Sequence, residues 1–236
     1  MNKQVKEVII RLKPDATVVC EEIFENNIVI SKHINIEDLC SAINSSIHLE
    51  GTETGILPEG CIYYKEDMAK SKYLVIKYNG RVDFTLYNTV YKDFPLPNML
   101  FGFKMANDGC VSKKMVACIK GNKIKMNTIL YHYPFSNVYD NFNICLGSNR
   151  FKTIRNITQI ESYPHYIMSI ANNNDLYNQA HNSCSFEYRE LLDYISDKNE
   201  FDDNLLVERD KTIKHFIESL IGTKVKEKEF NIAIPA

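Results

Sequence analysis

The sequence lacks paired cysteines, a field of charge of one sign and a long hydrophobic run, and each absence excludes a class of protein. Seven widely spaced cysteines form no CxxC pair, and their odd number argues against a disulfide framework and against a structural zinc site. A reducing compartment fits this pattern best. The 28 Lys and Arg and the 30 Asp and Glu residues are interspersed and give a net charge of −2, so neither nucleic acid nor an acidic membrane surface is favoured as a partner.

No segment approaches the roughly 18 consecutive apolar residues of a membrane span, and the first 15 residues contain no apolar stretch of signal-peptide length. We therefore expect a soluble, cytoplasmic protein. The 236 residues, 44% of them apolar, can bury a real core as one domain or as a domain with an appendage. No internal repeat or low-complexity tract is present.

The first part of the chain predicts a small β/α appendage over residues 1–55. Short apolar runs predict three strands, at 5–12, 18–20 and 28–30. A helix is expected at 36–45, where Asn35 or Asp38 can cap its start. Residues 50–60, with three glycines and a proline, are the best candidate for a linker.

The middle of the chain predicts a four-stranded antiparallel meander. Strand patterns occur at 61–64, 73–78, 82–87, 99–105, 111–119 and 124–131. Asn79-Gly80 and Asp108-Gly109 are typical of tight hairpin turns, and Pro95 and Pro97 mark the entry to the strand at 99–105. Helices are expected at 158–172, 187–196 and 207–221. Strands followed by helices indicate an α+β domain over 56–222, with a tail at 223–236.

The segment 131–148, YHYPFSNVYDNFNICLGS, nominates Cys145 as a nucleophile, because this cysteine lies between a polar loop and Gly147-Ser148. A thiolate attacks thioesters readily, and the new thioester keeps enough energy to pass its acyl group to an amine. The carbonyl oxygen gains negative charge during attack, so an amide donor nearby would stabilise it. Asn137 is the candidate donor. The other six cysteines are assigned to the core or the surface.

Two further side chains are candidates for accessory roles. His132 precedes the loop and could act as a base for Cys145, as in a cysteine protease. Asp140 is close enough in sequence to help deprotonate an incoming lysine amine, although Tyr-Asp-Asn is also ordinary turn chemistry. The asparagines at 172–174 are interpreted as a helix terminus and loop. Nothing in the pattern predicts a metal site or a bound cofactor.

The stretch around Cys145 resembles the active site of ubiquitin-conjugating enzymes, in which an asparagine lies eight positions before an Ile-Cys-Leu cysteine. Over residues 57–148 the chain is similar to protein B of the bacterial PRTRC systems and to the related prokaryotic family D of ubiquitin-conjugating-like proteins. The hallmarks are Leu57-Pro58, Phe94-Pro95-Leu96-Pro97, Met99-Leu100-Phe101, Pro134-Phe135, Asn137-Val138-Tyr139 and Cys145-Leu146-Gly147. Two features depart from the pattern: the chain has no tryptophan after the cysteine, and Pro134-Phe135-Ser136 stands where His-Pro usually precedes the asparagine.

This resemblance implies a ubiquitin-conjugating-enzyme-like fold with a cysteine-bearing loop. It also implies a cysteine that receives a ubiquitin-like protein from a ThiF-type activating enzyme, in gene neighbourhoods that can include a JAB-type metalloprotease for removal. By position, Cys145 and Asn137 take the roles of nucleophile and oxyanion donor.

The resulting hypothesis is a bacterial carrier that holds a ubiquitin-like protein on Cys145 and passes it to an acceptor. Two alternatives remain open at this point. A non-catalytic interaction module of a plasmid or defence operon would have Cys145 as a packed residue and Asn137 as a turn residue. A thiol hydrolase that cleaves conjugates would need His132 or another histidine to pair with Cys145.

Overall fold

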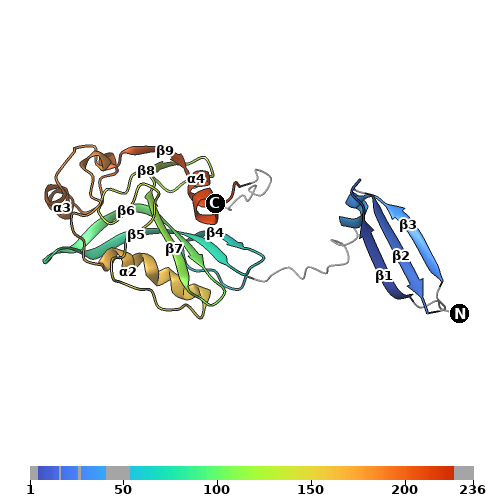
Figure 1. The fold of residues 1–236 in the computed structure, drawn as a ribbon. Helices are drawn as coiled ribbons and strands as arrows, with labels where there is room; N and C mark the ends of the chain where they lie inside the picture. Colours follow the sequence, from blue (N-terminus) through green and yellow to red (C-terminus); the bar gives the residue numbers. More distant parts are fainter. Residues whose placement is uncertain (1–4, 16, 26–27, 41–53, 226–236) are drawn as a thin grey trace. The chain divides into compact units, whose positions relative to one another are not determined.

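A computed structural model of the chain describes residues 5–15, 17–25, 28–40 and 54–225 (Figure 1). The chain divides into two compact units, Met1–Gly55 and Ile56–Ala236, and the candidate thiol belongs to the second. No helix within the described ranges is long and apolar enough to cross a membrane.

The first unit is a three-stranded antiparallel sheet whose strand order follows the sequence. Its strands are β1 (Val5–Leu12), β2 (Val18–Phe24) and β3 (Val29–Ile34), where the apolar runs predicted them. A helix begins at Ile36, and the Asn35 side chain caps it by accepting a hydrogen bond from the Asp38 N–H at 2.7 Å. Residues 41–45 of the predicted helix lie outside the described residues.

The second unit is α+β and contains a six-stranded antiparallel sheet. In spatial order the strands are β4 (Cys61–Glu66), β5 (Lys72–Leu86), β6 (Thr89–Met105), β7 (Val111–Cys118), β8 (Ile129–Tyr131) and β9 (Glu208–Thr212). The first four form an antiparallel meander, as predicted, but the strands expected separately at 73–78 and 82–87 are one strand, β5. Of the strand expected at 124–131, only β8 is extended, and it pairs on its outer side with β9 from near the end of the described chain.

The hairpin turn predicted at Asn79-Gly80 is wrong. β5 continues through this dipeptide with a register shift between Tyr78 and Gly80, and the chain reverses only at the two residues between Leu86 and Thr89. Gly80 has a φ of 133°, so the glycine serves a bulge within the strand. Continuous pairing on both sides of the dipeptide outweighs its local preference for a turn.

Both prolines expected at the start of a strand instead lie inside β6. Pro95 pairs with Arg81, whereas Pro97 lies between the pairs that Leu96 and Met99 make with β5. The register shift there leaves Pro97 without a paired residue, so its missing N–H costs no ladder hydrogen bond. The bulge thus allows β6 to be 17 residues long.

The turn predicted at Asp108-Gly109 is confirmed. Ala106 donates its N–H to the Cys110 carbonyl at 2.9 Å and accepts one from Gly109 at 2.9 Å. Gly109 has a φ of 83°, and a Cβ at this position would stand 2.0 Å from the carbonyl oxygen of Ile154. Only glycine fits this turn, which therefore packs directly on the segment that follows the candidate cysteine.

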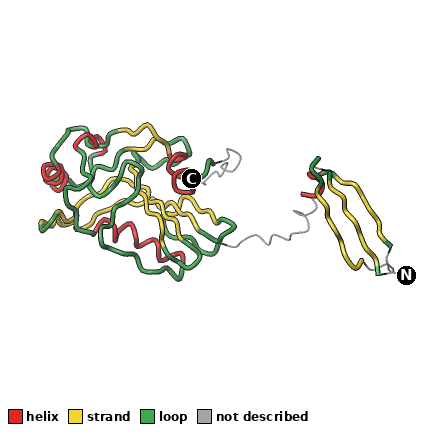
Figure 2. Tube along the Cα trace, in the orientation of Figure 1, coloured by secondary structure: helices red, strands yellow, loops and turns green. Residues whose placement is uncertain are grey.

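Short helices, drawn red in Figure 2, follow the meander. They are the 3-10 turns η1 (Ile157–Ser162), η2 (Gln179–His181) and η3 (Asp203–Leu205) and the α-helices α2 (Tyr163–Ser169), α3 (Tyr188–Ser196) and α4 (Ile213–Ile221). The helix predicted at 187–196 is confirmed. The helix predicted at 158–172 is divided between η1 and α2, and the one predicted at 207–221 begins only at Ile213, because β9 pairs with β8.

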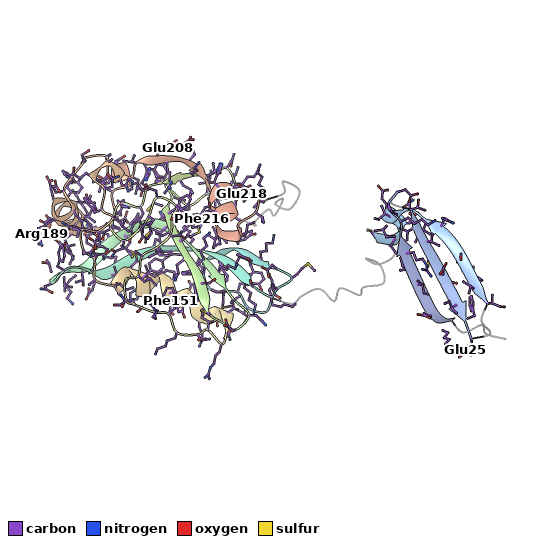
Figure 3. All side chains as sticks on the ribbon, viewed as in Figure 1. Glu25, Phe151, Arg189, Glu208, Phe216 and Glu218 are labelled. Carbon is purple, nitrogen blue, oxygen red and sulfur yellow. The ribbon has the colours of Figure 1, made fainter. Side chains whose placement is uncertain are left out.

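The two faces of the sheet carry separate apolar cores. Alternation along β5 sends Leu74 to one face and Val75 to the other, and both are fully buried. The first core includes residues of α2 and α3, and the second includes residues of α4. Phe216 of α4, labelled in Figure 3, lies over Gly102, where a Cβ would stand 3.0 Å from its ring. The glycine lets α4 approach the sheet closely.

Candidate active site

The candidate thiol lies at the end of a small hairpin that runs from Asn137 to Cys145. Their backbones face each other, since the Cys145 N–H donates to the Asn137 carbonyl at 2.8 Å. Val138 and Ile144 form the next bridge, and a turn over 139–143 closes the hairpin. The spacing of eight residues therefore places Asn137 and Cys145 directly opposite each other at the open end.

The β7 strand holds this hairpin in place. Ile144 donates its N–H to the Lys114 carbonyl, and Val116 donates its N–H to the Phe142 carbonyl, each at 3.0 Å. The side chains of the hairpin enter both cores, because Ile144 belongs to the core of the first face and Phe142 to that of the second. The loop that carries the cysteine is thus fixed by backbone bonds and by packing.

Phe142 is the deepest anchor of the hairpin. It is buried at a φ of 71°, an unfavourable backbone conformation for an aromatic residue that the surrounding contacts must offset. Its ring packs edge-on against Phe216, with centroids 5.2 Å apart, and the Arg209 guanidinium lies 4.0 Å from its centroid. Arg209 also donates to the Asp140 carbonyl, which ties the turn to β9.

Cys145 itself is half-buried at the rim of a shallow cleft. Its neighbours Ile144, only 9% exposed, and Leu146 both pack against the first core, so the cysteine backbone has little freedom. Apolar side chains such as Ile167 line one part of the cleft, and the amide of Asn172 lines another. A thiol held in this way is accessible from solvent and firmly positioned.

Asn137 has a φ of 64°, in the left-handed region that asparagine tolerates better than most residues. Its backbone N–H donates to the Asp175 carbonyl at 3.2 Å, and its side-chain Nδ2 donates to Oδ1 of Asn172 at 3.1 Å. An amide nitrogen carries two hydrogens. Asn172 takes one of them, which leaves a second donor on the Asn137 side chain.

A buried polar network lies behind Asn137. The Ser136 hydroxyl donates to Oδ1 of Asn172 at 3.1 Å and lies 3.2 Å from the Tyr188 hydroxyl, which also accepts the Ser136 N–H. Ser136 is 1% exposed, Asn172 6% and Tyr188 2%, so these groups find their hydrogen-bond partners within the protein rather than in water. Burial raises the pKa of Tyr188, which keeps its hydroxyl protonated.

The tip of the β5–β6 hairpin holds Asn172 from the other side. The Asn172 N–H donates to the Thr85 carbonyl at 2.7 Å, and the Asn172 carbonyl accepts from the Tyr87 N–H at 2.8 Å. The side-chain Nδ2 donates to the carbonyls of Thr85 and Ile170, at 3.3 and 3.0 Å. The sequence interpretation of 172–174 as an ordinary loop missed this role, since only the fold brings these segments together.

Tyr139 is a second residue near the thiol for which no catalytic role was predicted. It lies on the same side of the hairpin as Cys145 and is 46% exposed. Interaction with the Cys145 side chain is the main cause that raises the pKa of the Tyr139 phenol. The phenol therefore lies near the thiol.

His132, the base candidate, stacks on His181 with ring centroids 4.1 Å apart. Its Nδ1 is buried without a partner, and within the described part of the chain no hydrogen bond joins His132 to Cys145. Burial, with the neighbouring His181 and Arg209, lowers the pKa of His132 to about 4. The imidazole is neutral at pH 7.

Asp140, the other accessory candidate, lies in the turn of the hairpin. Burial lowers the pKa of His181, and the nearby Asp140 carboxylate opposes this shift, as it does for His132. The same carboxylate acts on Arg209. The structure thus places Asp140 among these basic groups.

The remaining cysteines differ from Cys145 in their surroundings. Cys118 is fully buried, and burial raises its pKa, as it does for the half-buried Cys61. Cys110 and Cys184 are exposed on the surface. Among the described residues, no three His, Cys, Asp or Glu side chains are grouped as a metal site would require.

A comparison with known protein families matches residues 44–209 to prokaryotic E2 family D, E2 being the ubiquitin-conjugating class. The matched range covers more than half of the chain and includes the meander, the hairpin and Cys145. No curated protein and no solved structure matches the sequence. The resemblance to prokaryotic family D is thereby confirmed, and the chain belongs to prokaryotic E2 family D.

Proposed function

We propose that the protein is a carrier that accepts a ubiquitin-like protein from a ThiF-type activating enzyme as a thioester on Cys145 and passes it to an acceptor. Membership of an E2 family indicates a role of the ubiquitin-conjugation kind. The finer proposal is carried by one observation, the opposition of Asn137 and Cys145 across a hairpin that is anchored in both cores.

In the first step, the Cys145 thiolate attacks the carbonyl carbon of the thioester on the activating enzyme. A new C–S bond forms to Cys145, a tetrahedral oxyanion develops, and the C–S bond to the activating enzyme breaks as its thiolate leaves. The free Nδ2 hydrogen of Asn137 can donate to that oxyanion. One thioester replaces another, so no redox change and no cofactor is required.

In the second step, an acceptor nucleophile attacks the carbonyl on Cys145. With an amine acceptor, a C–N bond forms, the Cys145 thiolate leaves, and the ammonium proton passes to water or to a base. The same donor on Asn137 serves this second oxyanion. The apolar side chains beside Cys145 support the proposal, because an extended tail that ends in a thioester could pack against them.

The partners and accessory residues remain predictions. A JAB-type metalloprotease from the same operon would reverse the modification, as the resemblance to the PRTRC family implies. Asp140 as an aid to the acceptor amine and His132 as a base are the predicted accessory roles, and both residues lie near His181 and Arg209.

A thioester-trapping experiment tests the proposal. The protein is incubated with ATP and with the ThiF-type enzyme and the ubiquitin-like protein encoded in the same operon. The products are separated on a non-reducing gel. We expect an adduct that thiols destroy in the wild type, a thiol-resistant ester in Cys145→Ser, and no adduct in Cys145→Ala. Cys184→Ser is the matched control, because it removes an exposed cysteine outside the hairpin and should behave as wild type.

Absence of any adduct, with a charged activating enzyme and a folded protein, would contradict the carrier proposal. It would favour the alternative from the sequence, an interaction module that docks an activating enzyme without accepting cargo.

A further inference from the structure

We propose that Asn172 is a positioning residue that fixes the side-chain amide of Asn137, so that one Nδ2 hydrogen always faces the reacting carbonyl. This inference rests on the proposed function for its effect on rate. Its structural part, the orientation of the Asn137 amide, can be measured without any reaction.

The Asn172 side chain has its full set of hydrogen bonds. Oδ1 accepts from Ser136 and Asn137, each at 3.1 Å, and Nδ2 donates to the carbonyls of Thr85 and Ile170. A flipped amide would direct its oxygen at the carbonyls of Thr85 and Ile170, which can only accept, so both of these bonds would be lost. With Asn172 only 6% exposed, water could not replace them, so one orientation is strongly preferred.

The fixed orientation of Asn172 also fixes that of Asn137, because the two side chains are hydrogen-bonded to each other. Because Asn172 presents only an oxygen, Asn137 must present Nδ2 rather than Oδ1. If that acceptor were lost, the Asn137 amide could rotate and bring its own oxygen toward the oxyanion, which would repel it. Asn172 therefore acts on the reaction through Asn137 and touches no reacting atom itself.

The hairpin tip makes this arrangement rigid. Residues Leu86 and Asn172 form a parallel bridge, and the Tyr87 hydroxyl accepts the N–H of Asn174 at 3.1 Å. Tyr87 keeps a φ of 52°, an unfavourable value for a tyrosine that the bonds to the 172–174 segment help to maintain. The long β5–β6 hairpin thus reaches the candidate site and holds Asn172 in place by hydrogen bonds.

Acyl transfer with a chemical probe tests the effect on rate. Cys145 is acylated with the mercaptoethanesulfonate thioester of acetyl-glycyl-glycine, and the release of the acyl group to free lysine is followed by mass spectrometry of the Cys145 peptide. We expect Asn172→Leu to lower kcat about 10- to 100-fold with KM for lysine unchanged, short of the loss of an oxyanion donor itself, about 100- to 1,000-fold.

A double-mutant cycle separates positioning from general damage. In an Asn137→Gly background the acceptor on Asn172 has nothing to orient, so Asn172→Leu should lower kcat no further. The matched control is Asn182→Leu, since Asn182 is a buried amide with its own bonds to Tyr177 and Phe186 and no contact with Asn137. It should lose stability and keep its kcat. Additive losses in the cycle, or an unchanged kcat in Asn172→Leu, would overturn the proposal.

Hydrogen exchange of the Asn137 side chain gives a result even if Asn172→Leu fails to fold or Cys145 accepts no acyl group. In the wild-type protein, NMR should find one Nδ2 proton of Asn137 protected and the other exchanging freely. Equal, unprotected exchange of both protons would refute the fixed orientation. If the protected proton is seen but no acyl-cysteine forms, the positioning role of Asn172 stands and the proposed carrier function fails.

Discussion

Position gives Cys145 and Asn137 their significance, since the chain has seven cysteines and many asparagines. Cys145 is the half-buried thiol that faces an asparagine across a hairpin, with a phenol beside it. Asn137 has a left-handed backbone that most side chains would strain. At the scale of single residues, the backbone role and the side-chain role of Asn137 can therefore be separated by experiment.

Replacement of Asn137 by glycine should abolish most of the activity while the fold persists. Glycine adopts a φ of 64° without strain, so Asn137→Gly loses only the amide and should lower acyl transfer about 100-fold or more. Asn137→Ala should lose the same activity and in addition about 1 kcal/mol of unfolding free energy, because alanine is strained in this region. Rates from the probe reaction and urea unfolding curves check both statements. Equal stability of the two variants would contradict the strain argument.

The stacked histidines predict a loss of stability in mild acid. Burial lowers the pKa of His132 from its ordinary 6.5 to about 4, so below pH 6.5 the unfolded chain binds a proton that the folded protein does not. The free energy of unfolding should therefore fall as the pH decreases from about 6.5 to about 4. Arg209 and His181 oppose the added charge, and Asp140 favours it.

Comparison with His132→Phe separates the effect of His132 protonation on stability from that of the carboxylates, which also titrate in acid. The phenyl ring can stack on His181 but takes up no proton, so the variant should lose about 1 kcal/mol less than wild type between pH 6.5 and 4, a value reduced for the partial exposure of His132. Parallel stability curves for the two proteins would show that the pair is not the cause.

The sequence allowed Cys145 and Asn137 to be selected, because their spacing lies within one short segment. It could not reveal Asn172, which lies 35 residues after Asn137 and meets it only once α2 has packed on the sheet. Three adjacent asparagines are typical of a loop, and no local pattern shows that the first of them is buried. Long-range packing is the information that the local pattern lacks.

At the scale of elements, the turn prediction succeeded where local packing requires glycine. It failed where the pairing of two long strands overrides the local preference for a turn. At Asp108-Gly109 the chain reverses as predicted, and the nearby Ile154 carbonyl leaves room only for glycine. Asn79-Gly80 has the same chemistry, but the pairing of β5 with β6 extends through it. The helix expected at 207–221 begins only at Ile213 for a similar reason, since Glu208–Thr212 pair with β8 as a strand.

Two glycines with similar backbone angles allow the cost of backbone strain to be measured separately from the cost of a steric clash. Gly109 and Gly121 have φ values of 83° and 68°, but a Cβ on Gly121 meets no atom within 4 Å, whereas one on Gly109 would collide with a carbonyl. We expect Gly121→Ala to cost about 1 kcal/mol of unfolding free energy and Gly109→Ala at least about 3 kcal/mol. Urea denaturation measures both. Similar costs would mean that the contact with Ile154 yields easily.

At the scale of the whole molecule, the second unit contains both of its cores. Among the residues that the structure describes, every member of the two clusters lies between Cys61 and Val225, within the second unit. The division of the chain into an appendage, a domain at 56–222 and a tail stays a prediction that truncation can test.

A chain that begins at Ile56 should fold by itself. Its free energy of unfolding should equal that of the corresponding transition in the whole protein, because the same core is buried in both. Calorimetry of the two proteins compares the transition temperatures, with the candidate thiol assayed by the acyl-transfer probe. A truncated chain that is unfolded would show that residues 1–55 contribute to the core of the second unit.

The hairpin of Cys145 places Phe142 in one core and Ile144 in the other, on opposite faces of a single sheet. Loosening of the core on either face would therefore disturb the same short loop. The site is therefore part of the cooperative unit of the fold, and a partly melted form in which the thiol geometry survives has no structural basis. On heating, inactivation and unfolding should share one midpoint, so the thermal tolerance of the chemistry is that of the domain itself.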